Sequence, residues 1–205
     1  MPGQPLHTEA LVLLKQPPTD RFQQFTVFAP AHGILLCLQR VSTKSTPTSQ
    51  RLDLFDEAEL FLESSNQGRT WFIKEARLRR RHTAIGGSYD GLRLASSFAR
   101  IIVRNPVGAE SRVRLGGLVR RTLGAFDGAA RPDLVYLKSL YCFARDEGYP
   151  VKQQWWQNLP PAERAIASEM LNRPLAEQTA LPGAVAGVIH QLEDYLRGHT
   201  EILLE

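Results

Sequence analysis

The sequence predicts an α+β protein, in which a small five-stranded barrel of the OB type is followed by an all-α domain. The first eighty residues hold five short apolar or alternating runs joined by polar turns. The rest holds amphipathic stretches of helical period separated by Pro and Gly. Five tightly connected strands fit a small closed barrel, and closely connected helices fit a bundle. We therefore predict two domains, residues 1–84 and 85–205.

Five strands are expected, each bounded by turn residues. They are TEALVLLK (8–15), DRFQQFTVFAP (20–30), ILLCLQR (34–40), RLDLFDEAELFLE (51–63) and TWFIKEARLRRR (70–81). The second and third are separated only by a short Gly-containing connection, which predicts a hairpin. The alternation in the fourth has a possible irregularity at DEAE, and Gly68 supplies turn chemistry before the fifth.

Five helices are expected in the second domain: residues 89–105, 109–126, 131–148, 161–173 and 182–199. The first has Leu92, Ala95, Ala99 and Ile102 on one face and stops before Pro106. The third begins with a proline in its first turn and ends at Gly148. Between the third and fourth, Trp155-Trp156 lies in a Pro-flanked connector. We expect one ring to pack inward, and the alternative makes the second ring a partner-binding anchor.

Composition excludes several classes of protein. No apolar run is long enough to span a bilayer, and MPGQPLHTEA lacks the features of a secretory signal. We therefore expect a cytoplasmic protein. Cys37 and Cys142 are expected to be buried free thiols, with a disulfide as the alternative. The scattered histidines have no zinc spacing, so no metal and no cofactor are predicted.

The positive charge is concentrated in one quarter of the chain. Residues 69–121 hold thirteen Lys/Arg against three Asp/Glu, whereas residues 1–68 carry a net −2 and residues 122–205 a net −4. Such a concentration is typical of a protein that binds a polyanion. The alternative is an ordinary solvated surface.

The most basic stretch is KEARLRRRH, residues 74–82. If Phe72, Ala76 and Leu78 face the barrel core, then Trp71, Ile73, Arg77, Arg79 and Arg81 point outward. This arrangement would make an exposed cationic edge with an aromatic platform, as single-strand-binding OB barrels use. About five of the seven aromatic residues of this domain are expected to be core; the seven are Phe22, Phe25, Phe28, Phe55, Phe61, Trp71 and Phe72. The alternative pairs the cations with acids such as Glu57 and Glu63, or with the acidic C-terminal half.

Catalysis would require acid–base or nucleophilic groups gathered at one place. The densest acidic group, Asp53 to Glu59, lies on an alternating strand, where a solvated face or bulge is the simpler interpretation. Ser96-Ser97 lacks a nucleophile-elbow context, and Cys142 has no evident base. The sequence therefore predicts a protein without enzymatic activity.

The order of these parts resembles the RecO family of bacterial recombination mediators. The resemblance is carried by TEALVLLKQPPTDRFQQFTVFAPAHGILLCLQR, by RLDLFDEAELFLE, by GRTWFIKEARL and by the helical run YDGLRLASSFARIIVRN. It is strongest over residues 8–105. Two departures matter: the four-cysteine zinc motif of many relatives is absent, where this chain has GYPVKQQWWQNLPP (148–161), and the loop 41–50 is less basic, with Lys44 its only internal cation.

The resemblance implies a mediator that binds single- and double-stranded DNA, anneals complementary strands and helps load RecA during recombinational repair. It implies RecR and the single-stranded-DNA-binding protein as partners, and association with the nucleoid in the cytoplasm. The candidate DNA-binding residues are Arg21, Arg40, Lys44, Arg51, Arg69, Trp71, Lys74, Arg77, Arg79, Arg80 and Arg81. The alternative is an interaction adaptor that keeps the fold and has lost most DNA binding.

The acidic, apolar-tipped tail of the single-stranded-DNA-binding protein needs a cation beside an apolar notch. Arg100 and Arg104 flank Ile101 to Val103 on the first predicted helix, and Arg120 and Arg121 lie beside Val119 and Leu123 on the second. If these helices are neighbours, their basic edges could converge on one groove for the tail. The alternative is that both stripes extend the DNA-binding surface.

Overall fold

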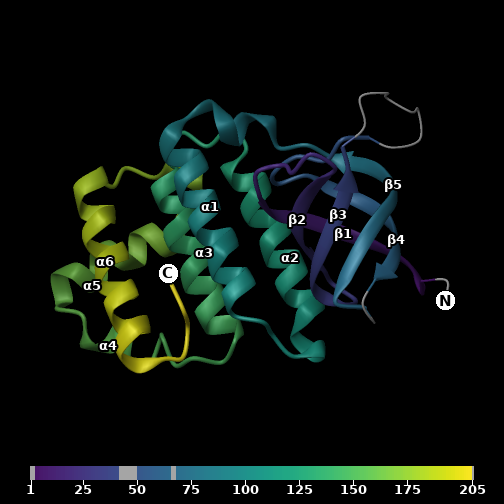
Figure 1. Cartoon of the computed structure of the whole chain (residues 1–205). Helices are drawn as coiled ribbons and strands as arrows, with labels where there is room; N and C mark the ends of the chain where they lie inside the picture. The colour runs from purple at the N-terminus through teal and green to yellow at the C-terminus, as the bar shows by residue number, and fades with distance from the viewer. Residues whose placement is uncertain (1–2, 42–49, 66–67, 205) are drawn as a thin grey trace. The chain divides into compact units, whose positions relative to one another are not determined.

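A computed structural model describes residues 3–41, 50–65 and 68–204. It is an α+β structure in which a five-stranded mixed sheet precedes the helices (Figure 1), as the sequence predicts. The strands are β1 (Pro5–Lys15), β2 (Phe22–Ala29), β3 (Gly33–Arg40), β4 (Glu57–Ser65) and β5 (Thr70–Arg80).

The chain divides into two compact units. One contains residues 1–82 and 106–116, and the other residues 83–105 and 117–205. The division differs from the single boundary expected after residue 84, because residues 106–116 belong with the sheet. A Cβ atom at Gly116 would lie 2.9 Å from Pro30 Cγ, and one at Gly33 would lie 3.3 Å from Arg112 Nε. This short segment therefore packs directly on the β2–β3 connection.

The sheet closes on itself. The strand order is β1-β2-β3-β5-β4, and β4 pairs back to β1. The pairs β1–β2, β2–β3, β1–β4 and β4–β5 are antiparallel. β3 and β5 are parallel, with Cys37 opposite Trp71 and Gln39 opposite Ile73.

Alternation along the strands fills the interior of the closed sheet, because successive strand side chains point to opposite faces. The core includes Val12 of β1, Phe25 and Val27 of β2, Cys37 of β3 and Leu60 of β4. Burial raises the pKa of the Cys37 thiol to about 12. Both cysteines are free; Cys37 is buried as expected, and Cys142 is half-buried.

A bulge in β5 changes which of its side chains face the core. Phe61 pairs with Glu75, and the next residue, Leu62, pairs with Ile73. Lys74 is therefore an extra residue, and an extra residue reverses the alternation beyond it. Ile73 and Ala76 are both core residues, and Trp71 packs against the same cluster. The prediction that Trp71 and Ile73 point outward with the arginines, and that Phe72 points inward, is wrong for this reason.

The sequence predicts a strand over residues 51–63, but β4 begins only at Glu57. Residues 50–56, which we call the lead-in segment, are not part of the strand. Within this segment Asp56 N donates to Asp53 O at 3.2 Å, which forms a turn. Phe55 has a φ of 66°, a region that bulky residues rarely adopt. Phe55 N donates to Val12 O and Val12 N donates to Asp56 O, so β1 holds the turn in place.

The second unit is helical. Its helices are α1 (Tyr89–Arg104), α2 (Ala109–Phe126), whose first turns belong to the sheet unit, α3 (Pro132–Asp146), α4 (Trp155–Asn158), α5 (Pro161–Asn172) and α6 (Pro182–His199), with 3₁₀ turns η2 (Thr83–Gly87) and η3 (Leu175–Glu177). The Ser88 side chain caps α1 by accepting from Gly91 N. Proline begins α3, α5 and α6.

Helix α3 is central to this unit, because α1, α5 and α6 all pack against it. The buried face of α1 includes Leu94, Phe98 and Ile101, whereas Leu92 is 39% exposed. The expectation that Leu92 belongs to the buried face is therefore wrong. Trp155 is 4% exposed and Trp156 is half-buried, which confirms that one ring of the pair packs inward.

Two properties of the described residues bear on the class of protein. None of their helices combines the length and the apolar character needed to cross a bilayer. Residues 3–41, 50–65 and 68–204 also include no group of three His, Cys, Asp or Glu side chains placed to hold a metal ion.

Candidate nucleic-acid interface

The basic run of β5 is exposed, but acidic side chains accompany its cations. Lys74 Nζ lies 2.5 Å from Glu63, Arg77 Nε lies 2.7 Å from Glu75, and Arg79 Nη2 lies 3.0 Å from Glu59. Arg80 is exposed at the end of the strand. The predicted cationic edge is therefore present, and its charge is largely balanced, as the alternative with acidic partners such as Glu63 anticipated.

These ion pairs shift the carboxyl groups toward ionisation. The hydrogen bond and the charge of Lys74 lower the pKa of Glu63. Desolvation would raise the pKa of Glu59, but the hydrogen bond from His7 and the charge of Arg79 lower it overall. All of these groups lie at the surface, where each pair contributes about 0–1 kcal/mol.

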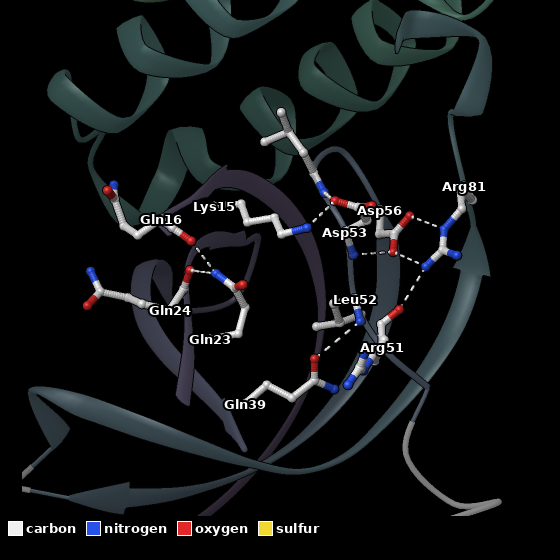
Figure 2. A network of polar contacts seen from close by, with 11 residues as sticks. Lys15, Gln16, Gln23, Gln24, Gln39, Arg51, Leu52, Asp53, Asp56 and Arg81 are labelled. Carbon is white, nitrogen blue, oxygen red and sulfur yellow. Dashed lines mark hydrogen bonds and ion pairs between the residues drawn. The ribbon is translucent and has the colours of Figure 1, made fainter. Parts of the chain in front are cut away.

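Arg81 differs from the other arginines of β5, because it binds a buried carboxylate (Figure 2). Its Nε lies 2.9 Å from Asp56 Oδ1 and its Nη2 lies 2.7 Å from Oδ2, while Nη2 also donates to Arg51 O at 2.8 Å. The side chain of Asp56 is 0% exposed and that of Arg81 40%. Hydrogen bonding to Asp56 raises the pKa of Arg81. This bidentate pair ties Arg81 to the lead-in segment. Replacing Arg81 is therefore expected to destabilise the fold.

Further contacts fix the lead-in segment to the sheet, and Figure 2 shows those of Gln39 with Leu52 and of Lys15 with Asp53. Gln39 Nε2 donates to Gln50 O at 2.8 Å, and Leu52 N donates to Gln39 Oε1 at 3.2 Å. Lys15 Nζ donates to Asp53 at 2.8 Å. Burial opposes ionisation of Asp53, but the hydrogen bonds from Lys15 and Leu54 N and nearby cations lower its pKa. Arg51 is thereby held through its backbone while its side chain stays exposed.

A stacked cluster covers the outer face of β1, β4 and β5. The His7 and Phe61 rings are parallel within 11° with centroids 4.2 Å apart, and the Arg77 guanidinium lies 4.9 Å from the Phe61 centroid. The two groups approach Phe61 from strands on either side of β4. Since its own neighbours occupy the ring, Phe61 is a poor platform for a nucleic-acid base.

The outer face of β2, β3 and β5 is different. We define the aromatic face as Phe22, Leu36, Leu38 and Phe72, all half-buried side chains on the side of the strands opposite the core. Phe22 and Phe72 have ring centroids 5.5 Å apart at an interplanar angle of 52°. Leu38 is the direct neighbour of Phe72 across the parallel β3–β5 pair. Two tilted rings beside aliphatic side chains form a surface on which bases can stack.

Cations border the aromatic face. Arg40 lies opposite Phe22 in the β2–β3 pair, and Arg21 O accepts from Val41 N at 2.8 Å. Both side chains are exposed, and the described part of the chain gives neither of them an acidic partner. Lys74 directly follows Ile73, the partner of Gln39 in the parallel pair, and its ammonium group is paired with Glu63. Arg69 is exposed just before β5.

The structure thus sorts the predicted DNA-binding residues into three groups. Arg21, Arg40 and Lys74 lie together at the aromatic face, Arg77 and Arg79 lie on the other outer face, and Arg51 and Arg81 belong to the lead-in network. Trp71 faces the core, and Lys44 lies outside the described residues. The sequence interpretation missed the role of Leu36 and Leu38. The unbroken apolar run ILLCL carried the signal, because a strand that is apolar on both faces has both faces covered.

The arginines expected to bind a partner lie on α1 and α2, next to apolar residues that are mostly buried. Arg100 and Arg104 are exposed on α1, but Ile101 and Ile102 beside them are fully buried. Arg121 is exposed and Arg120 half-buried on α2, where Val119 and Leu123 are buried. α1 packs against α3, and the groove expected between the two basic stripes stays a prediction.

Protein-family models and curated proteins were compared with the sequence, and neither comparison found a match.

Proposed function

We propose that the protein binds single-stranded DNA on the aromatic face, with Arg21 and Arg40 contacting the phosphates. The observation that carries the proposal is the combination of two outward phenylalanine rings with neighbouring arginines that have no acidic partner among the described residues. Proteins that hold single strands combine aromatic stacking platforms with cations along the backbone path.

The topology supports the same proposal. A five-stranded sheet that closes through β1, and in which β3 neighbours β5 rather than β4, fits an OB-type barrel. OB barrels bind oligonucleotides on the face of strands 2 and 3 and through the loops that flank it. The aromatic face lies on these two strands and on β5, which supplies Phe72, and Arg21 and Arg69 come from the adjoining loops.

The wider function follows from the RecO resemblance and belongs to the same proposal. The protein would bind single- and double-stranded DNA, anneal complementary strands and help load RecA onto strands coated by the single-stranded-DNA-binding protein, with RecR as a further partner. It would need no cofactor and would catalyse no reaction.

The stacking part of the proposal is tested by titrating a labelled single-stranded oligonucleotide and following fluorescence anisotropy. Phe22→Ala and Phe72→Ala should each weaken binding by roughly 5- to 100-fold, since a stacked base contributes about 1–3 kcal/mol. Phe61→Ala is the matched control, because its ring is covered by His7 and Arg77. Equal losses for all three variants would contradict the assignment of this face.

The phosphate part is tested by the salt dependence of the same titration. Replacing both Arg21 and Arg40 by serine should reduce the slope of log K against log salt by up to about 1.4, at roughly 0.7 per lost phosphate contact on a single strand. Arg77→Ser/Arg79→Ser is the control, because these arginines are already paired with Glu75 and Glu59. If the slope changes more in this control than in the Arg21/Arg40 variant, the phosphate contacts lie on the basic run of β5 instead.

A second candidate is an interaction adaptor with the same fold and little affinity for DNA. The pairing of Lys74, Arg77, Arg79 and Arg81 with acids favours it, because it reduces the free basic charge of the sheet unit. Under this alternative, the wild-type protein would not bind the oligonucleotide even at low salt, where phosphate contacts are strongest.

A further inference from the structure

The helical unit contains a cavity of about 630 Å³ between α1, the start of α3 and α6. Its lining is mixed: apolar groups such as Leu94 alternate with Arg93, Arg131 and Glu193. Tyr136 OH donates to Glu193 Oε1 at 2.9 Å, and burial and the Glu193 charge raise the pKa of this tyrosine. The cavity is large enough to hold a small organic molecule.

Part of the wall of this cavity comes from the segment after α6. We define the C-terminal strap as residues 200–204, which are extended rather than helical. Thr200 Oγ1 accepts from Ile202 N at 3.2 Å and donates to Leu196 O at the end of α6. Ile202 is 5% exposed, Leu203 is 51% exposed, and Leu204 lines the cavity.

One side chain ties the strap to α1. Asn105, at the C-terminal end of α1, donates from Nδ2 to Leu203 O at 2.9 Å and accepts from Leu203 N at Oδ1 at 2.8 Å. The same amide donates to Ile101 O at 2.7 Å. Its carboxamide thus satisfies both backbone groups of one strap residue, as a neighbouring strand would. The strap is held by this amide, by the hydrogen bonds of the Thr200 hydroxyl and by the buried side chain of Ile202.

We propose that the C-terminal strap is a movable wall of the cavity and that the Asn105 side chain holds it in place. Segments fixed by few buried contacts open locally at a lower free energy than the helices around them. Release of the strap moves Leu204 away from the cavity lining, while α1 and α6 keep their contacts with α3. The strap therefore controls the extent of the cavity independently of the sheet unit and its proposed ligand.

The role of Asn105 in holding the strap is tested by hydrogen–deuterium exchange on the full chain. In Asn105→Ala the amides of residues 202–204 should exchange roughly tenfold faster, while those of α3 and α6 keep their protection. Asn172→Ala is the matched control, since Asn172 also ends a helix and bonds the carbonyl four residues back, at Ser168. Ile202→Ser should release the strap without altering α1. Strap amides that exchange equally fast in wild type and Asn105→Ala would overturn the proposal.

The contribution of the strap to the cavity wall is tested with the dye anilinonaphthalene sulfonate, which fluoresces in apolar sites. Asn105→Ala and Ile202→Ser should both increase its fluorescence, and adding Ala186→Trp, which fills the cavity from its lining, should remove the increase. If the strap amides exchange faster but dye binding is unchanged, or if Ala186→Trp leaves the increase in place, the strap is not a wall of this cavity.

Discussion

Arg81 shows how one residue of a basic run can have a role unlike that of its neighbours. In the sequence it is the last of three consecutive arginines, all of which suit phosphate binding. In the structure it is the partner of a fully buried carboxylate and holds Arg51 through the backbone. Arg81 and Arg79 carry the same charge, so the sequence does not distinguish them. They differ in how deeply the carboxylate that each one binds is buried.

Arg81→Ala should lower the free energy of unfolding by about 2–4 kcal/mol, because removing one partner leaves the other charge buried and unpaired. The lower part of this range is expected, since the Arg81 side chain is itself 40% exposed. Arg79→Ala is the control and should cost about 1 kcal/mol or less, as expected for a surface pair. Urea denaturation measures both, and equal midpoints for the two variants would contradict the structural role of Arg81.

At the scale of elements, the bulge at Lys74 decides which aromatic residue of β5 supports the fold and which is available at the surface. Without it, strict alternation puts Trp71 outside and Phe72 inside. With it, Trp71 packs on the core cluster and Phe72 contacts Phe22 on the aromatic face.

Trp71→Ala should therefore destabilise the protein by about 2–4 kcal/mol, since it removes a large side chain from the core. Phe72→Ala should cost about 1 kcal/mol, as expected for a partly exposed residue. The two variants form a matched pair at adjacent positions of one strand, and thermal unfolding compares them directly. The opposite order of stability would mean that the bulge is absent in solution.

The outer face of β4 predicts how stability depends on pH. The pKa values of Glu59 and Glu63 are lowered from an ordinary value of 4.5. A carboxyl group with a lower pKa in the folded state stabilises the protein above its unfolded-state pKa, and this contribution is lost as the pH falls through the folded value. Stability should therefore decrease as the pH drops below about 4.5, and less steeply in Glu59→Gln/Glu63→Gln. Parallel pH profiles of the urea midpoint would contradict the pairing.

At the scale of the whole molecule, the charge division and the structural division do not coincide. The basic quarter, residues 69–121, supplies β5 to the sheet unit, α1 to the helical unit and α2 to both. Its net charge of +10 is therefore spread over different surfaces. Pairing with acids of β4 reduces it further, so the net charge of a segment is a poor guide to where a polyanion binds.

Two distant cysteines and scattered histidines predict that the protein folds without a metal ion. A chelator should leave the melting temperature unchanged, whereas proteins with structural zinc unfold when the metal is removed. Metal analysis of the purified protein provides the control. One zinc ion per chain, or a lower melting temperature in the chelator, would contradict this expectation.

Much of the fold could be predicted from local patterns. Residues 109–126 and 182–199 form helices at the predicted boundaries, because helical periodicity and proline at the first turn act within a few residues. The alternating strands and the inward ring of the Trp155-Trp156 pair followed for the same reason. The candidate site was only partly predictable: Arg21, Arg40 and Lys74 were expected, whereas the roles of Phe22 and Phe72 as neighbours were not.

The sequence by itself determined the order of strands and helices and the concentration of positive charge, because these depend on residue type and local spacing. Tertiary structure alone decided which side of β5 faces the core, which cations meet an acid, and that residues 106–116 pack with the sheet. These outcomes depend on one extra residue in a strand register and on contacts between residues far apart in the chain. The alternation of apolar and polar residues along a strand reveals neither feature. A single bulge reverses which side chains face the core without changing the composition of the strand.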